Sequence, residues 1–479
     1  MPYRFVPTVR TAVLAALMIL FVVPVPLFGE PVPENGDAST LKEAGLETCI
    51  QTAMENNHRR PASRYAVEMA EAQHRQALAG YWPHVGLRAG YRHMDESPNF
   101  IFPAFNMSLP MGGPTPITIP VPEQDIKLMD KDSFNASIEA TWLLYDGGMR
   151  KGYTEQAEGL IEMMKQESRR TDLEILDSVK RLYYGAVLAA RLHQVGNDTL
   201  ARMEATLNLT ETMYKEGSGK VKKTDWLNNK VMVESLRSMV ALLEKNELMA
   251  QAALANTMGM PWNSSVKPID RDMPFAPFRD ELDGLVSTAY RFNPDWGKIE
   301  AGLRSAAGAV QTAESGHYPK LAVNGELHRW WNDYDAGLVT DRNKEGWSVG
   351  VGIEIPLFSG FLTQGKVAEA RARVAKIKEE QFLLKEGIGL QIRDTFLALS
   401  AAEKSHQATQ EAMAASKENR ELNTRAYQHE LVETEDVIRA QLLEALMCAQ
   451  HYKTCYDHIA LQSQLNVIVG TEVLKKIQE

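Results

Sequence analysis

FNASIEATWLLYDGG, residues 134–148, joins a strand pattern directly to the start of a helix. Apolar residues alternate with polar ones as far as Trp142, and this period of two is typical of a strand with one apolar and one polar face. Gly147 and Gly148 then open a proline-free run to about residue 214, with apolar residues every three or four positions. A helix of that length would extend roughly 100 Å, so we expect it to lie along other helices in a coiled-coil manner.

The alternating pattern recurs along the chain in segments of about ten residues. It predicts strands at about 84–94, 133–145, 321–330 and 346–357. A tilted strand of this length can cross a bilayer, but a soluble sheet with one face on a core gives the same alternation. The alternation alone therefore leaves both interpretations open.

The chain repeats its own pattern once. Residues 46–83 align without a gap with residues 282–319, and Leu144–Gly147 aligns with Leu357–Gly360. We expect two copies of one unit, each ordered as helix, strand, loop, strand, long helix, turn and return helix. The predicted boundaries are 41–260 for repeat 1, with long helix 148–214 and tip turn 215–223; 261–280 for a linker; 281–473 for repeat 2, with long helix 361–427 and tip turn 428–434; and 474–479 for a tail.

Two half-length helices in each copy match the long one, because the helix before the strands and the return helix can be stacked end to end beside it. Copy one also holds extra residues in Ser97–Pro122, which contains seven prolines. Proline disrupts helices and inner strands, so this segment is predicted to be a long loop.

The first segment of the chain has the pattern of a targeting sequence. Arg4 and Arg10 precede the apolar run 11–28, which predicts a signal peptide at 1–29, followed by a Pro-rich linker at 30–40. A membrane anchor is the alternative, because the run approaches the ~20 residues of a spanning helix.

Composition excludes several classes of protein. The net charge of −10 argues against a nucleic-acid partner, and an apolar content of 44% argues against a disordered chain. Three cysteines do not make a disulfide framework. The catalytic motif His-Glu-x-x-His is absent from the sequence. The pattern Gly-x-Ser-x-Gly occurs at Gly346–Gly350, but within the predicted strand and not at a strand-to-helix turn, so we expect no enzyme activity and no cofactor.

Four strands cannot close into a barrel, and open edges in a bilayer leave backbone groups unsatisfied at several kcal/mol each. If the strands span a membrane, several chains must share one barrel. Three chains would give twelve strands, enough to enclose a lumen.

The chain resembles the TolC-type outer-membrane factor family. The matching features are the duplicated corners Gly80–Pro83 and Gly316–Pro319, the strand-to-helix corners Leu144–Gly148 and Pro356–Gly360, and the tip turns beginning at Tyr214 and Tyr427. The resemblance implies a mixed α/β membrane protein, mostly α, in which a homotrimeric 12-stranded β-barrel continues into a long periplasmic α-helical barrel.

The resemblance further implies a passive exit duct in the outer membrane of a Gram-negative bacterium, in contact with outer-membrane lipid. The implied partners are a periplasmic adaptor protein and an inner-membrane transporter, within an efflux pump or a type I secretion system. The substrate stays open among drugs, metals and proteins. The alternative function is a periplasmic coiled-coil scaffold or adaptor without channel activity.

The two predicted tips carry opposite charge. The candidate gate residues are Lys220, Lys222, Lys223 and Asp225 in copy one, and Glu433, Glu435, Asp436 and Arg439 in copy two. We hypothesise that ion pairs between tips help to hold the mouth closed; the alternative is solvated loop charges worth ~0–1 kcal/mol a pair. The family often has an acidic pair at positions i and i+3 here, and Arg439 departs from that pattern.

One helix also carries four potential metal ligands, Cys448, His451, Cys455 and His458, on one face. The run extends about 15 Å along the axis, whereas zinc ligands lie ~2.0–2.3 Å from one point. All four cannot converge, so we expect helix-packing residues and no metal. A two-ligand site completed by a neighbouring element is the alternative.

Overall fold

The computed structural model describes residues 41–109, 112, 117–217, 220–334 and 337–471. The predicted signal peptide 1–29, the linker 30–40 and the tail 474–479 lie outside the described residues.

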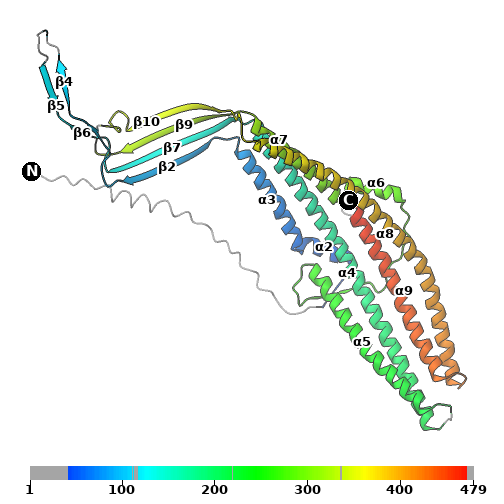
Figure 1. Ribbon diagram of the computed structural model, residues 1–479. Coiled ribbons are helices and arrows are strands. Elements are labelled where there is room, and N and C mark those ends of the chain that lie inside the picture. The colour runs from blue at the N-terminus through cyan, green and yellow to red at the C-terminus, as the bar shows by residue number, and fades with distance from the viewer. Residues whose placement is uncertain (1–40, 110–111, 113–116, 218–219, 335–336, 472–479) are drawn as a thin grey trace, which may run out of the picture. The chain divides into compact units, whose positions relative to one another are not determined.

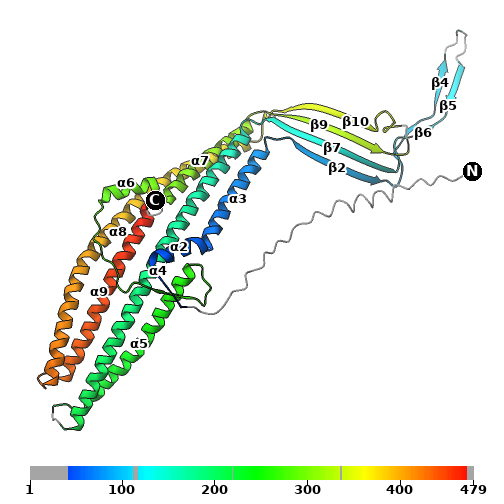
Figure 2. The same ribbon diagram turned by 180° about the vertical axis from the view of Figure 1, so that it is seen from behind.

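Two long helices dominate the structure, and shorter helices lie beside them (Figures 1 and 2). The long helices are α4 (Met149–Lys215) and α8 (Leu362–Gln428); the return helices are α5 (Lys223–Thr257) and α9 (Thr434–Val469); the helices before the strands are α3 (Arg59–Ala79) and α7 (Pro294–Glu314). Both α3 and α5 pack along α4, and both α7 and α9 pack along α8. Two shorter helices thus lie along each long helix, as the predicted helix lengths indicate.

The four longest strands form one antiparallel sheet in the order β10-β9-β7-β2. They are β2 (His84–His93), β7 (Asp132–Tyr145), β9 (Lys320–Trp331) and β10 (Glu345–Glu354). Among the described residues, the outer strands β2 and β10 are each paired on one side only. β10 ends before the predicted residue 357, because Pro356 has no backbone N–H to continue the ladder.

Register places the apolar residues of all four strands on one face. Leu87 pairs with Ile138, Ile138 with Leu327, and Leu327 with Trp347. The opposite face carries Arg88, Ser137, His328 and Gly346 in the neighbouring row. The apolar residues are also exposed, for example Val351 at 69%. This sheet therefore does not cover a core of its own chain, as a soluble sheet would.

The prediction of a long loop at Ser97–Pro122 is wrong. The described residues of the segment form a ribbon of two antiparallel strand pairs: β3 (Asn99–Phe102) pairs with β6 (Gln124–Lys127), which follows the segment, and β4 (Phe105–Leu109) pairs with β5 (Ile117–Val121). Pro103 and Pro122 fall between the short strands, and Pro120 lies within a two-stranded ribbon, where one side of every strand is an edge. Proline is tolerated at such positions because no ladder hydrogen bond needs its nitrogen.

The predicted linker 261–280 contains a strand as well. β8 (Ser265–Pro268) pairs in parallel with β1 (Leu41–Ala44). Val266 is buried there against α2 (Leu46–Asn56), α4 and α5, in a core cluster with Tyr183 and Leu254. A second core cluster joins α6 (Leu282–Phe292) to α8 and α9 through Ala289, Ile392 and Leu465. These two clusters hold the middle of the helical part together.

Small residues bring α4 and α7 into close contact. A Cβ at Gly152 would lie 2.6 Å from the Gly308 carbonyl oxygen, and one at Gly308 would lie 2.8 Å from the Gly152 carbonyl oxygen. Two helical turns further along α4, a Cβ at Gly159 would likewise lie 2.8 Å from the Ser305 backbone nitrogen of α7. The helices α4 and α7 therefore pack along a seam that leaves no room for a side chain at Gly152 or Gly308.

Among the described residues, no helix combines the length and the apolar character needed to cross a membrane.

Candidate functional site: the strand-to-helix corner and the helical tips

The corner between β7 and α4 is fixed by a buried ion pair. Asp146 Oδ1 accepts a hydrogen bond from Gly148 N (3.0 Å), and Asp146 Oδ2 accepts from Arg150 N (2.9 Å) and Arg150 Nε (2.7 Å). Arg150 Nη1 also donates to the Leu143 carbonyl (2.6 Å). Gly147 and Gly148 have φ of 67° and 92°, which favours glycine. The pair of side chains satisfies helix-start and strand-end groups together, so it sets the angle between strand and helix.

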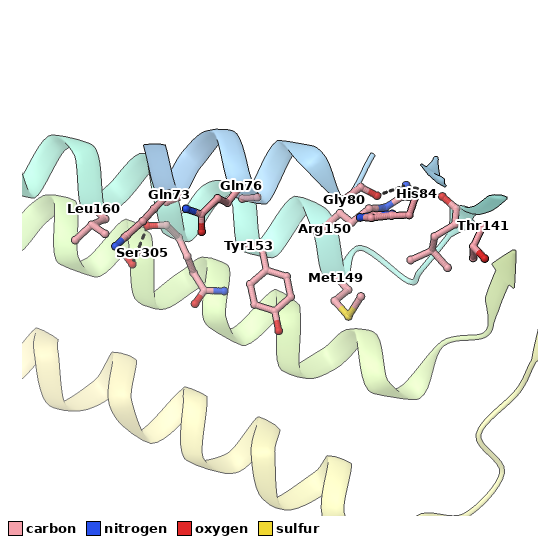
Figure 3. A pocket seen from close by; sticks show the side chains of 14 residues that line it. Gln73, Gln76, Gly80, His84, Thr141, Met149, Arg150, Tyr153, Leu160 and Ser305 are labelled. Carbon is pink, nitrogen blue, oxygen red and sulfur yellow. Dashed lines mark hydrogen bonds between the residues drawn. The ribbon is translucent and has the colours of Figure 1, made fainter. Parts of the chain in front are cut away.

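An open pocket of about 810 Å³ lies beside this corner (Figure 3). Gln73 and Gln76 of α3, Tyr153 of α4 and Ser305 of α7 line it. Arg150 is its one Lys, Arg, Asp or Glu side chain, and Asp146 already neutralises that charge. The pocket thus offers neutral amide and hydroxyl groups at the level where helices give way to strands.

Figure 1 shows the two turns that join α4 to α5 and α8 to α9. The predicted tip residues lie in these turns or within the first two helical turns of α5 and α9. Asp225 and Asp436 cap their return helices: each accepts from the backbone N–H three residues earlier, Asp225 from Lys222 (2.9 Å) and Asp436 from Glu433 (3.4 Å). Their carboxylates therefore stabilise helix starts, a role that the sequence analysis did not assign to them.

The structure brings only some of the opposite charges together. Lys220 Nζ lies 3.3 Å from Glu430 Oε2 and joins the two tips of one chain. Arg439 pairs with Glu435 (2.6 Å) on its own helix. Within the described part of the chain, Lys222 and Lys223 make no ion pair.

A buried hydroxyl network joins the two helical hairpins just above the turns, and the sequence analysis missed it. The Tyr427 hydroxyl on α8 lies 2.9 Å from Thr210 Oγ1 on α4 and 2.9 Å from Thr434 Oγ1 on α9. Asn229 of α5 donates to Thr210 Oγ1 (3.4 Å), and Gln441 of α9 donates to Thr206 Oγ1 (2.9 Å). The available signal was a series of threonines at helical spacing, Thr199, Thr206 and Thr210, on one face of α4.

One charged cluster also links the hairpins. Glu444 of α9 accepts from Arg420 Nε of α8 (2.9 Å) and lies 3.3 Å from Arg202 Nη2 of α4. The hydrogen bond to Glu444 raises the pKa of Arg420. The Glu444 side chain is 8% exposed, so removing one partner would leave a nearly buried charge uncompensated.

The comparisons with known proteins identify the family. The model of the family described as outer membrane efflux protein matches residues 49–260 and 285–470. These ranges make up most of the chain, and the chain belongs to the outer membrane efflux protein family. It is a transport protein and not an enzyme.

Solved structures agree with this fold at low sequence identity. The outer membrane protein VceC of Vibrio cholerae has a TM-score of 0.69 at 17% identity, with 89% of this chain and 96% of VceC covered. The open state of the MtrE outer membrane channel of Neisseria gonorrhoeae has a TM-score of 0.66 at 15% identity, with 91% of this chain and 94% of MtrE covered.

A curated relative is similar in sequence over part of the chain. Protein CyaE of Bordetella pertussis is 24% identical over 278 residues, which is 57% of this chain and 57% of CyaE. The match thus spans somewhat more than half the length of either protein.

Proposed function

We propose that three copies of this chain form a duct that conducts substrates passively across the outer membrane of a Gram-negative bacterium. The observation that carries the proposal is the sheet: one continuous exposed apolar face, one polar face, and two edges left unpaired among the described residues. Exposed edges in a bilayer are costly, and three such sheets joined edge to edge make a closed cylinder of twelve strands. Lipid would contact the apolar face, and water the polar face.

The helices support the same assembly. The helices α3, α4, α7 and α8 lie in a row, with α4 and α7 joined at the Gly152–Gly308 seam. The sequence repeat aligns Gly152 with Gly365 on α8, and Gly308 with Ala72 on α3. A Cβ at Gly365 would meet nothing within 4 Å. The two end helices of the row therefore present the two halves of a second seam, which a neighbouring copy would complete.

The internal duplication is part of this proposal. The family model matches two separate ranges of the chain, which supports two copies of one unit. We propose that the helical part extends into the periplasm, where an adaptor protein contacts it and an inner-membrane transporter supplies energy. An efflux pump and a type I secretion system both fit this arrangement.

The test of the proposed function is membrane fractionation followed by conductance measurement. We expect the full chain in the outer-membrane fraction. When the purified protein is added to a planar lipid bilayer held at a fixed voltage, we expect discrete steps in conductance. The competing function, a periplasmic scaffold without channel activity, predicts a chain released with the soluble periplasmic contents and no conductance. That second result would overturn the duct.

We further propose that tip ion pairs contribute to closure of the inner mouth. Lys220 and Glu430 already join two tips within one chain, and Lys222 and Lys223 remain available for neighbouring tips. The Lys220 and Glu430 side chains are 64% and 40% exposed, so each pair is worth only ~0–1 kcal/mol. Three symmetry-related pairs would thus add only modestly to the free energy that favours the closed state. The buried hydroxyl network at Tyr427 would contribute the larger part of that free energy.

Reversing the tip charges should raise the conductance of the closed state. We expect Lys220→Glu and the double variant Lys222→Glu/Lys223→Glu each to increase leak through the resting channel in single-channel recordings. The matched control is Lys220→Glu/Glu430→Lys, which restores the pair with opposite polarity and should return the leak toward the wild-type value. Equal closed-state conductance in all variants would show that the tip charges are merely solvated.

A further inference from the structure

Three potential metal ligands from two different helices meet in the structure. His451 and Cys455 lie at i and i+4 on α9, and His406 reaches them from α8. One ligand atom from each residue lies within 4.8 Å of the other two. The sequence places four candidates along α9 that cannot converge; the structure instead combines two of them with a residue 45 positions upstream of His451. Among the described residues this is the one such group found.

The separations suit coordination. Cys455 Sγ lies 3.8 Å from His451 Nε2. Ligand atoms of a tetrahedral zinc ion are roughly 3.5 Å apart when the bonds are about 2.0–2.3 Å. His451 Nδ1 lies 3.3 Å from Thr409 Oγ1, so the outer nitrogen of this ring has a partner and Nε2 faces the thiol. A hydrogen bond to the ring nitrogen that faces away from the metal orients a ligating imidazole.

Zinc binds the neutral form of imidazole and the thiolate form of cysteine, so binding of the ion at Cys455 would release the thiol proton to solvent.

An aromatic ring covers the cluster. Phe275 stacks on His406 with ring centroids 3.7 Å apart and also contacts His458 at 4.5 Å. His458 is fully buried, and neither of its ring nitrogens has a hydrogen-bond partner in the described part of the chain. Its Nε2 lies 3.8 Å from Glu403 Oε1. Two imidazoles and a thiol thus lie beside a buried imidazole whose ring nitrogens have no hydrogen-bond partner among the described residues, whereas buried polar groups usually have one.

We propose that His406, His451 and Cys455 bind a Zn²⁺ ion, with water in the fourth position. Two nitrogens and a sulfur match the ligand preference of zinc, whereas Mg²⁺ and Ca²⁺ require oxygen ligands. The bound ion would fasten α8 to α9 at a point closer to the tips than to the sheet. The site does not depend on the proposed duct, because its ligands come from one chain.

Cobalt titration tests the proposal directly. Purified full-length protein in detergent, freed of metal with a chelator, is titrated with Co²⁺, which replaces zinc and absorbs visibly when tetrahedral. We expect one ion per chain, with a thiolate-to-cobalt charge-transfer band that Cys455→Ser abolishes and that Zn²⁺ displaces. His406→Ala should weaken binding more than about 100-fold, beyond the 10–100-fold that losing an outer-shell group costs.

Cys448→Ser is the matched control, because Cys448 lies on the same helix but outside the cluster. It should leave the band unchanged. Thermal unfolding provides a second measurement: Zn²⁺ should raise the unfolding temperature of the wild type and of Cys448→Ser, but not of His406→Ala. Absence of a thiolate band in the wild type, or its persistence in Cys455→Ser, would overturn the site.

Discussion

Replacing Gly152 by leucine should prevent the chain from folding stably. The Cβ alone would lie 2.6 Å from the Gly308 carbonyl oxygen and 2.7 Å from the Thr312 backbone nitrogen. These are backbone atoms, so the helices α4 and α7 would have to separate along the seam. Overpacking typically costs about 1–3 kcal/mol, and a clash with backbone between α4 and α7 belongs at or above the upper end of that range.

Helix propensity works against this loss, which makes the result informative. Leucine in place of glycine inside a helix gains about 0.8–1 kcal/mol, so a net destabilisation must come from packing. The measurement is the yield of folded protein and its resistance to limited proteolysis. Protection equal to that of the wild type would contradict the close seam between α4 and α7.

Gly365→Leu is the matched control, because it repeats the substitution at the aligned position of the second copy. Within one chain its side chain enters open space, so the helices should stay resistant to protease. In the proposed trimer, however, Gly365 faces α3 of a neighbouring copy. We expect a folded chain with a reduced yield of cross-linkable trimer. Normal trimer yield would place the second seam elsewhere.

Periodicity made the strands and long helices predictable. Both periodicities depend on the spacing of apolar residues along a single strand or helix, as at Phe134–Trp142. They can therefore be recognised without knowledge of any contact with another element. The ribbon was not predictable in this way, because proline disrupts inner strands and the sequence pattern does not show that these strands have free edges. A two-stranded ribbon has free edges that accept proline at positions such as Pro120.

The candidate sites were less predictable because they depend on contacts between distant residues. The charges of the tips can be read from the sequence, but the capping roles of Asp225 and Asp436 depend on local backbone geometry. The network at Tyr427 joins residues more than 200 positions apart, for example Thr210 and Tyr427. The cluster around Cys455 likewise needs His406 from another helix.

A charge on the apolar face of the sheet should separate the two functions that the sequence leaves open. Val351 lies near the middle of β10, pairs with Val323 and is 69% exposed in the single chain. Arginine at the midplane of a transmembrane barrel costs about 2–4 kcal/mol for each copy on the lipid face. We therefore expect Val351→Arg to abolish recovery of assembled protein from the outer membrane.

Asn324→Arg is the control at matched depth, because Asn324 pairs with Gly350 in the row next to Val351 and lies on the polar face. It should assemble normally and change only the conductance or ion selectivity, since water surrounds that face in the proposed duct. A periplasmic scaffold predicts a different outcome, in which an exposed arginine at either position is tolerated. Equal assembly of both variants would thus exclude lipid contact at Val351. If only Val351→Arg fails to assemble, the surroundings of the sheet must exclude charge on one face and accept it on the other. Only a membrane-spanning sheet with a wet interior meets both conditions.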